Sequence, residues 1–321
     1  MIKKKVFGNT LKAQLIAGAK DRLYRFLLAD ETVRGVLANG TRMVNEMRWN
    51  HELGILETLV LGRAYLGCGL MSANLKGNDR VSLQIECSGP IKGLDVEANA
   101  FNEVRGYLRN VPIPIEKPME DFDLSPFFGA GFLTVTRYLE DGKQPFSGKV
   151  ILEYGNIAKD LAHYFLKSEQ LPTAFNLSIK FDSEGSVTGA GGLFLQAMPG
   201  ADDKTTAGLE NLVLDFPSLG VVFSEENDPE ALIREVFSQY SPLLLGSRRI
   251  EFMCHCNEDR IRTMLSLLSI DELKDILENG PFPVEIRCHN CNTHYLFDRP
   301  EIEAYSNRDM SWLSFIFLIK S

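Results

Sequence analysis

The chain has 321 residues, of which 45% are hydrophobic, so it is long enough to bury a sizeable core and to divide into two or three domains. Its net charge of −9 argues against a protein that binds the phosphate backbone of nucleic acids, for which a basic surface is expected. Six cysteines, four of them in metal-binding spacing near the C-terminus, suit a reducing cytoplasm better than an oxidised, secreted scaffold.

Neither the ends of the chain nor its most apolar stretch is predicted to place it in a membrane. Met1–Lys5 is positively charged like the start of a signal peptide, but polar residues interrupt the segment that follows, so we expect no secretion signal. The apolar stretch Leu53–Leu75 contains Glu57 and Arg63, which favours a buried core helix over a membrane span. The apolar tail Met310–Lys320 is too short to span a bilayer. We therefore expect a cytoplasmic protein.

Residues 1–199 are predicted to form an N-terminal core domain, and the whole chain to belong to the α+β class. Helical periodicity predicts helices over Leu53–Asn74 and Ile157–Ser168. Apolar and β-branched runs predict strands at Leu23–Leu28, Val81–Cys87, Ile91–Ala98, Glu103–Arg109, Phe132–Tyr138, Val150–Glu153, Phe175–Phe181 and Leu193–Met198. Ser88-Gly89-Pro90 is a hairpin turn signal between two of them. Runs of strands with helices inserted between them indicate a mainly antiparallel sheet rather than alternating βαβ units.

Residues 200–250 are predicted to form a helical linker, which begins at a break in composition after Pro199. Asp228-Pro229-Glu230 is a typical helix start, because aspartate caps the helix and proline is tolerated in its first turn. A spacing of three or four residues places four apolar side chains on one face of this segment: Leu232, Val236, Phe237 and Tyr240. This stripe is compatible with an ordinary contact between domains and with a surface that becomes exposed when the protein is activated.

Residues 251–321 are predicted to form a small zinc-binding module with an apolar tail. A C-x-C pair and a C-x-x-C pair provide the four soft ligands that a closed tetrahedral zinc site requires: Cys254, Cys256, Cys288 and Cys291. Between the pairs, Ser269–Glu272 has the pattern of a capping box, and Gly280-Pro281 ends the short helix that it starts. Pro283–Arg287 is extended and leads to the second pair. The sequence thus predicts one zinc ion per chain.

Histidines flank the cysteines, and the first cysteine pair has an uncommon spacing. His255, His289 and His294 lie close to the cysteines in the sequence, but four thiolates already complete a tetrahedron. Zinc ribbons generally use two C-x-x-C pairs, and a disulfide between residues two positions apart closes a small, strained ring of the labile, regulatory kind. A structural zinc site that only fastens the C-terminal region is an equally good interpretation of the cysteines alone.

No arrangement of residues in the sequence is typical of an active site. The glycine-rich stretch Gly189–Gly192 neither precedes Lys-Ser/Thr nor opens a βαβ unit, so turns and strand bends explain it better than phosphate binding. His51 and His163 stand alone on apparent helices, and Cys68 and Cys87 are typical of free core thiols. We therefore expect that the protein is not an enzyme.

The cysteine spacing, in an acidic chain of this length, resembles that of the redox-regulated thirty-three-kilodalton heat-shock chaperones, a family of bacterial holdases. The resemblance follows the family's order from about residue 21 to about residue 305. The segments that carry it are Val104–Tyr107, Tyr164 with Ser168–Thr173, Gly191–Gln196 with Met198-Pro199, His294–Phe297, Leu75–Gly77 and Ser88–Pro90. Each is weak alone, but together with the cysteines they are specific. The lysine-rich N-terminal lead-in and the apolar tail depart from the family's pattern.

The resemblance implies a core, a metastable helical linker and a C-terminal redox switch. The reduced, zinc-bound form would be inactive. Oxidants would form the disulfides Cys254–Cys256 and Cys288–Cys291, eject zinc and unfold the switch and the linker. The surface exposed in this way would bind unfolded client proteins without ATP. A homodimer is a further candidate for the oxidised form.

Two other classes of function fit part of the sequence. A thiol-disulfide oxidoreductase would place a C-x-x-C pair at the start of a helix in a βαβ unit, whereas Cys288 follows one extended segment and precedes another, Tyr295–Phe297. A zinc-ribbon-like nucleic-acid-binding protein fits the cysteines but not the acidic balance or the absence of a strip of basic and aromatic residues. We therefore expect neither nucleic acid nor a membrane among the partners.

Overall fold

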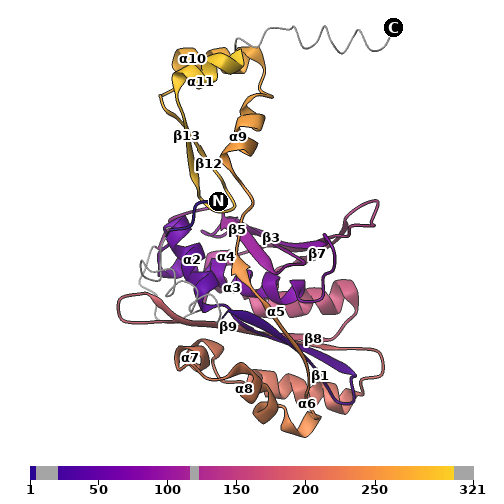
Figure 1. Cartoon of the computed structure of the whole chain (residues 1–321). Helices are drawn as coiled ribbons and strands as arrows, with labels where there is room; N and C mark the ends of the chain where they lie inside the picture. The colour runs from indigo at the N-terminus through magenta and orange to yellow at the C-terminus, as the bar shows by residue number, and fades with distance from the viewer. Residues whose placement is uncertain (5–20, 116–122, 307–321) are drawn as a thin grey trace, which may run out of the picture. The chain divides into compact units, whose positions relative to one another are not determined.

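The structure is a computed structural model, and it describes residues 1–4, 21–115 and 123–306. The chain divides into two compact units, one formed by residues 3–254 and the other by residues 1–2 and 255–321. The larger unit contains two mainly antiparallel sheets and the helices that pack on them (Figure 1). The smaller unit contains a two-stranded sheet with helices. This architecture confirms the predicted α+β class.

A five-stranded antiparallel sheet of the larger unit has the strand order β10-β1-β2-β9-β8. In chain order its strands are β1 (Arg22–Leu28), β2 (Val33–Asn39), β8 (Thr173–Phe181), β9 (Val187–Ala197) and β10 (Leu243–Arg249). The outer strand β10 therefore comes from the segment expected to be a helical linker, and it pairs with β1. The pairing of β2 with β9 joins strands from the two ends of the predicted core domain into one sheet.

A second sheet of the larger unit has the order β11-β5-β4-β3-β6-β7. Its strands are β3 (Arg80–Cys87), β4 (Gly93–Asn99), β5 (Glu103–Leu108), β6 (Gly131–Tyr138), β7 (Phe146–Ile151) and β11 (Glu251–Phe252). The expected turn at Ser88–Pro90 joins β3 to β4, which pair antiparallel from Arg80 opposite Asn99 to Glu86 opposite Gly93. The short strand β11 pairs with β5 in parallel and leads directly to the first cysteine pair.

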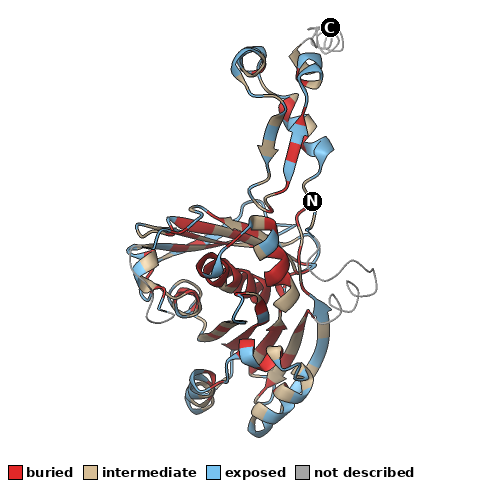
Figure 2. Ribbon diagram, turned by 90° about the vertical axis from the view of Figure 1, so that its left-hand side faces the viewer, coloured by how far each residue is buried: buried red, intermediate tan, exposed pale blue. Residues whose placement is uncertain are grey.

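The most apolar helix of the chain, α3 (Ile55–Ser72), contacts strands of both sheets and is buried between them (Figure 2). By length and composition it is the one helix in the described part of the chain that could cross a membrane, but 83% of it is buried inside the protein. This burial fits the predicted core helix. The other helices of this part are α2 (Thr41–His51), α4 (Ser125–Phe128) and α5 (Ile157–Tyr164), which continues into a π-helical turn, η1 (Phe165–Glu169).

Three further helices cover the face of the five-stranded sheet that is turned away from α3 (Figure 1). They are α6 (Asp203–Leu214), α7 (Leu219–Ser224) and α8 (Pro229–Val236), and the last leads into a 3-10 turn, η2 (Ser238–Tyr240). The expected helix start at the head of α8 is confirmed, because the Asp228 side chain accepts a hydrogen bond from the Glu230 backbone N–H at 3.2 Å. The segment expected as a linker is thus helical up to residue 240 and packs within the larger unit.

Several elements differ from the sequence-based expectation. Strand β2 was not predicted, and of helix α2 only the last residue, His51, was expected to be helical. Strand β7 spans Phe146–Ile151 rather than Val150–Glu153. The stretch Leu243–Arg249 was expected to belong to a helical linker, but it is strand β10 and pairs with β1. The strands β10 and β2 pair with segments far away in the sequence, β1 and β9, and local sequence preference does not encode such pairing. Strand β7 pairs with its neighbour β6, and this register sets its bounds.

The smaller unit is built around a two-stranded antiparallel sheet. Its described elements are α9 (Glu258–Leu265), α10 (Ile270–Asn279), β12 (Val284–Arg287), β13 (His294–Phe297) and α11 (Arg299–Ser306). The predicted capping box is confirmed, since Ser269 and Glu272 each accept the other's backbone N–H. Gly280 lies at the end of α10, as expected. The apolar tail Met310–Lys320 and the lysine-rich lead-in after Lys4 lie outside the described residues.

Candidate functional site

The first cysteine pair lies between β11 and α9. Cys254 is buried and follows β11, and the Met253 N–H donates to the carbonyl oxygen of Val104 at 3.0 Å, which extends the pairing with β5 by one residue. Cys256 is half-buried and precedes α9, whose N-cap residue is Asn257. The sheet and the helix cap therefore fix the two ends of the C-x-C segment.

The second cysteine pair lies in the tight loop between β12 and β13. The backbone N–H groups of Cys291 and Asn292 both donate to the Cys288 carbonyl oxygen, at 3.3 and 2.7 Å, and the Cys288 N–H donates to Thr293 at 2.9 Å. Asn292 has a left-handed φ of 51°, which asparagine tolerates better than most residues and which closes the loop. The C-x-x-C pair thus joins two strands and does not start a helix, unlike the pair of a thioredoxin-like oxidoreductase.

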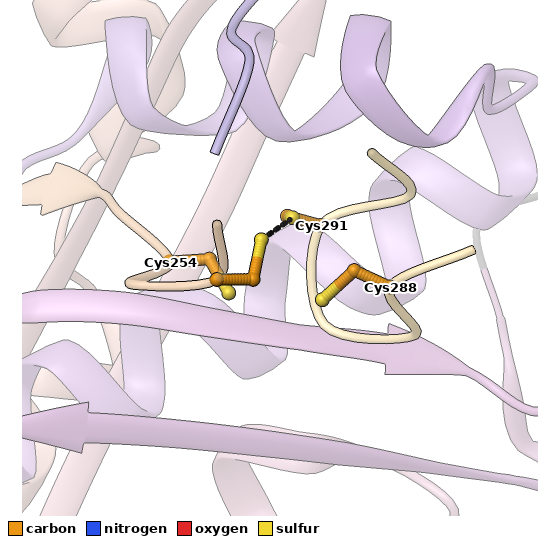
Figure 3. Close-up of side chains that lie close together, drawn as sticks. Cys254, Cys288 and Cys291 are labelled. Atoms are coloured by element: carbon orange, nitrogen blue, oxygen red, sulfur yellow. Dashed lines mark hydrogen bonds between the residues drawn. The ribbon is translucent and has the colours of Figure 1, made fainter. Parts of the chain in front are cut away.

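The structure brings the four predicted cysteines together. The Sγ atoms of Cys254, Cys256, Cys288 and Cys291 all lie within 4.8 Å of one another, and those of Cys256 and Cys291 are 3.3 Å apart (Figure 3). Four thiolates around a zinc ion, with Zn–S bonds of about 2.3 Å, would lie about 3.8 Å apart. The spacing and the softness of the donors therefore fit zinc. Within the described ranges, no other group of His, Cys, Asp or Glu side chains gathers in this way.

The neighbouring histidines do not belong to this group of sulfurs. His294 lies on β13 and its Nδ1 atom is 2.6 Å from a carboxylate oxygen of Glu285 on the paired strand. His255 and His289 are exposed, and neither contributes to the group of candidate ligands. The geometry thus agrees with a ligand set made of cysteines alone.

Two hydroxyl groups that were not predicted from the sequence contact the cysteine sulfurs. The Tyr295 hydroxyl donates to the Sγ atom of Cys256 at 3.2 Å, and the Thr293 hydroxyl lies 3.2 Å from the Sγ atom of Cys291. Burial raises the pKa of Tyr295, and its hydrogen bond to Cys256 acts in the same direction, so the phenol stays protonated and remains a donor. Strand alternation was the available signal, because Thr293, Tyr295 and Phe297 face the same way and are buried.

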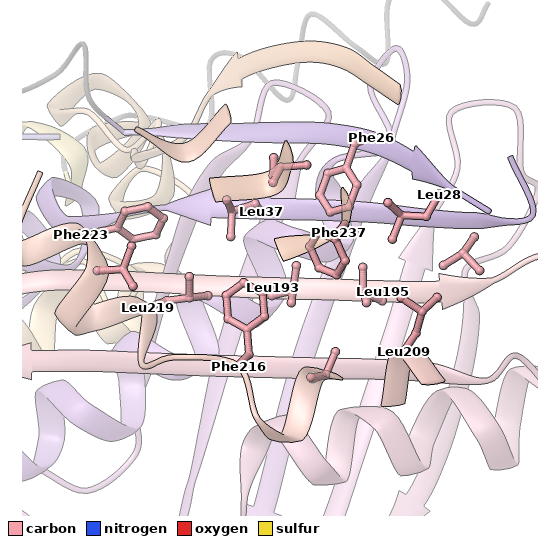
Figure 4. Packing of buried hydrophobic residues seen from close by; sticks show 14 residues of the cluster. Phe26, Leu28, Leu37, Leu193, Leu195, Leu209, Phe216, Leu219, Phe223 and Phe237 are labelled. Atoms are coloured by element: carbon pink, nitrogen blue, oxygen red, sulfur yellow. The ribbon is translucent and has the colours of Figure 1, made fainter. Parts of the chain in front are cut away.

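The apolar stripe expected on the linker packs against the five-stranded sheet. Phe237 is fully buried, and the centre of its ring lies 5.4 Å from that of Phe26 on β1 and 5.9 Å from that of Phe216 (Figure 4). The other expected residues of the stripe are partly buried against the same cluster: Leu232, Val236 and Tyr240. Ile233 is 1% exposed and was missed, although it lies one helical turn before Phe237. The stripe is therefore covered in this structure.

Helix α7 approaches the sheet at glycines. A Cβ atom on Gly189 of β9 would lie 2.0 Å from the carbonyl oxygen of Gly220, and one on Gly220 would lie 2.7 Å from the backbone nitrogen of Lys180. Only residues without a side chain allow the two backbones to come so close. The glycine-rich stretch of β9 thus serves helix packing, in keeping with a structural rather than a phosphate-binding interpretation.

The chain is similar to one family along most of its length. A family model described as Hsp33 protein matches residues 21–298. The 33 kDa chaperonin of Ruminiclostridium cellulolyticum is 35% identical over 286 residues, which cover 88% of this chain and 97% of that protein. The 33 kDa chaperonin of Desulforamulus reducens is 35% identical over 291 residues, or 90% of this chain and 98% of that protein. The crystal structure of the 33 kDa chaperonin (heat shock protein 33 homolog) of Thermotoga maritima superposes with a TM-score of 0.80 at 32% identity and covers 89% of this chain and 97% of that one.

Proposed function

Since the chain belongs to the Hsp33 family of chaperones, we propose that it is a redox-regulated, ATP-independent holdase. Membership of a chaperone family implies that the chain binds client proteins, a role that needs no catalysis. In our proposal the reduced, zinc-bound form is inactive, and oxidation converts it into a form that protects unfolding proteins from aggregation. The observation that carries the proposal is the group of four cysteine sulfurs, all within 4.8 Å of one another.

Zinc would hold the four sulfurs as thiolates, which is the form that oxidants attack. We propose one ion per chain, bound by Cys254, Cys256, Cys288 and Cys291. The smaller unit has a small apolar core of its own, contributed by α9, α10, β13 and α11. A structural zinc site can supply about 10–16 kcal/mol of folding free energy, and a unit of this size depends on such a contribution. Loss of the metal would therefore unfold the smaller unit.

Oxidation of the four thiolates to two disulfides removes four electrons, which two molecules of hydrogen peroxide accept as they are reduced to water. We propose the pairs Cys254–Cys256 and Cys288–Cys291, which the family resemblance implies and which each lie within one short segment. The competing pair is Cys256–Cys291, whose Sγ atoms are 3.3 Å apart. Disulfides that close such short loops constrain the unfolded chain little, so they do not replace the stabilisation by zinc.

The proposed client-binding surface is the apolar stripe of the linker, Leu232, Val236, Phe237 and Tyr240, to which the structure adds Ile233. In this functional division, residues 1–199 are the core, 200–250 the linker and 251–321 the redox-switch module. An apolar surface of this kind, once uncovered, binds unfolded proteins. Its cover in the reduced protein is the five-stranded sheet, so its release requires that helices α6–α8 leave that sheet.

Several properties of the working protein follow from the same proposal. Unfolded proteins are its partners, and a homodimer is a candidate state of the oxidised form. We place it in the cytoplasm, where thiols are reduced until an oxidant appears. The net charge of −9 supports a protein that binds neither nucleic acid nor an anionic membrane surface.

The test compares reduced, zinc-loaded protein with peroxide-treated protein in the suppression of citrate synthase aggregation, with released zinc measured in the same samples. We expect suppression only after oxidation, in proportion to the zinc released. Equal suppression in both states would leave a chaperone without a redox switch. Reduction of insulin disulfides, or a shift of plain DNA in a gel, would instead support an oxidoreductase or a nucleic-acid-binding protein.

A further inference from the structure

An open pocket of about 500 Å³, called the cavity below, lies at the surface of the larger unit, and no cysteine lines it. Three segments form its walls: the loop between α3 and β3, the turn between β4 and β5, and the end of β10. The residues that line it include three with positively charged side chains and one aromatic residue: Lys76, Gly77, Phe101, Asn102, Arg248 and Arg249. Its volume is in the range of small-molecule sites, which is roughly 300–1,000 Å³.

The cavity gathers positive charge in a protein that is acidic as a whole. Arg249 is ion-paired with Glu251 at 2.9 Å, but neither Lys76 nor Arg248 has an ion-pair partner among the residues that the structure describes. Both of these side chains are exposed. Two unpaired cations at one cavity, in a chain with a net charge of −9, favour an anionic ligand.

Two carboxylates near the cavity, those of Glu140 and Asp79, accept hydrogen bonds from the backbone. The loop residue Gly77 is close to the Glu140 carboxylate, which accepts the backbone N–H of Asn78 at 3.0 Å. The Asp79 carboxylate in turn accepts the Glu140 N–H at 2.8 Å. Both acids keep their negative charge and lower the positive potential near Lys76, but among the described residues neither forms an ion pair with Lys76 or Arg248, so the two cations can still contact a ligand directly.

Hydrogen bonds hold the turn between β4 and β5 in place. The Phe101 N–H donates to the Asn99 side chain at 2.9 Å, and the buried side chain of Asn102 donates to the Ser72 hydroxyl at the end of α3 at 2.9 Å. Asn102 has a φ of 61°, a left-handed conformation that turns the chain at this point. Phe101 itself is 69% exposed, which is unusual for a large aromatic side chain and offers a face on which a ligand ring can stack.

We propose that this cavity binds a small anion with two or more adjacent phosphate groups. Lys76 and Arg248 would pair with the phosphate oxygens, and the planar guanidinium suits bidentate contacts. Such an anion comes either as an inorganic oligophosphate or as a nucleoside phosphate, and only the second can use the ring of Phe101. The ligand would connect β10 to two loops of the core, so it would also stabilise β10 in the sheet.

Isothermal titration calorimetry of the full-length, reduced, zinc-loaded protein tests this proposal, with sodium triphosphate in one arm and ATP in the other. We expect saturable binding that weakens as NaCl is raised. The variants Arg248→Gln and Lys76→Gln should each weaken binding about tenfold, as loss of one charge-assisted contact implies. The matched control is Lys143→Gln, which removes one positive charge from a residue that does not line the cavity.

The Phe101→Ala variant distinguishes the two sources. Weaker binding of ATP with unchanged binding of triphosphate assigns the site to a nucleoside phosphate, whereas no effect on either assigns it to the phosphate chain. Hydrogen exchange adds an independent readout, because bound ligand should protect amides of residues 75–77, 100–102 and 243–249. The proposal is overturned if neither anion binds saturably, or if Lys143→Gln weakens binding as much as Arg248→Gln. Zinc content after each titration verifies that the phosphates have not removed the metal.

Discussion

The hydroxyl of Tyr295 donates a hydrogen bond to the Sγ atom of Cys256 at a distance of 3.2 Å. Tyr295 is buried on β13, the strand that follows the second cysteine pair, whereas Cys256 belongs to the first pair. The contact therefore joins the two halves of the candidate metal centre. A hydrogen bond to a thiolate lowers its nucleophilicity and holds it in place. Tyr295 is therefore expected to set how readily Cys256 is oxidised, without being a metal ligand itself.

Replacement of Tyr295 by Phe tests this role. A hydrogen bond to a charged group contributes about 1.5–3 kcal/mol. If part of this free energy raises the barrier to oxidation of Cys256, its loss should make zinc release by peroxide about three- to tenfold faster. The rate is measured with a zinc-sensitive dye under excess peroxide. Tyr305→Phe, in the same unit, removes a hydroxyl that contacts Glu301 and should leave the rate unchanged. Identical rates for wild type and Tyr295→Phe would show that the contact does not protect Cys256.

The metal content of the protein should depend on cysteines and not on histidines. Cys256→Ser removes a soft ligand from the group of four sulfurs and should reduce zinc to well below one per chain, as measured by elemental analysis of the purified protein. His255→Ala, His289→Ala and His294→Ala should each retain one zinc. Loss of metal in a histidine variant would mean that the ligand set has been assigned wrongly.

The apolar stripe should become a chaperone surface when its docking is weakened. Phe237→Glu places an unpaired carboxylate at a position with 0% exposure, which costs several kcal/mol. The free energy that docks the linker on the sheet should be only a few kcal/mol, because oxidation could not otherwise release the linker. We therefore expect that reduced, zinc-bound Phe237→Glu suppresses citrate synthase aggregation.

Two further variants show whether activation results from weaker docking of the stripe. Ala231→Glu adds the same charge at an exposed position of α8 and should remain inactive until it is oxidised. Gly189→Ala adds no charge but brings a methyl group within 2.0 Å of the Gly220 carbonyl oxygen, so it should also activate the reduced protein by displacing α7. Inactivity of both Phe237→Glu and Gly189→Ala in a folded, reduced state would place the regulated surface elsewhere, most simply on the core sheets.

Hydrogen exchange should show that oxidation unfolds only part of the chain. Amides of residues 21–199 should keep their protection after oxidation, and those of residues 204–305 should lose it, because only the C-terminal part depends on zinc. Strand β10 is the sharpest reporter, since its pairing with β1 protects it in the reduced protein. Uniform protection after complete oxidation contradicts the proposed switch.

The protonation of Asp21 should make the free energy of unfolding decrease as the pH rises from about 4 to 7. Burial raises the pKa of Asp21 from its ordinary value of 3.8 to about 7, even though its carboxylate accepts the backbone N–H groups of Arg42 and Met43 at the start of α2. In this window the folded protein holds a proton that the unfolded chain has released. Asp21 alone therefore lowers the free energy of unfolding by up to about 1.4 kcal/mol for each pH unit gained.

Urea unfolding at several pH values measures this effect. The difference in stability between wild type and Asp21→Asn should change between pH 4 and 7, because the amide does not titrate. A difference that stays constant across this range would mean that Asp21 is ionised in the folded protein throughout.

Local spacing in the sequence determines much of the candidate site. The two cysteine pairs, the capping box at Ser269 and the helix start at Asp228 are all short-range patterns, whose geometry follows from covalent connectivity and from hydrogen bonds within one turn. The same holds for the hairpin at Ser88–Pro90. These features need no distant partner, so the sequence alone was sufficient to predict them.

Tertiary structure decided the features that depend on distant segments. Leu243–Arg249 carries three leucines that equally suit a helix, and only pairing with β1 makes it a strand. The contact of Tyr295 with Cys256, the burial of Phe237 against Phe26 and the cavity with Lys76 and Arg248 all join residues far apart in the chain. Such contacts depend on strand register and on packing, because the free energy of a long-range contact exists only once the rest of the fold has brought its partners together.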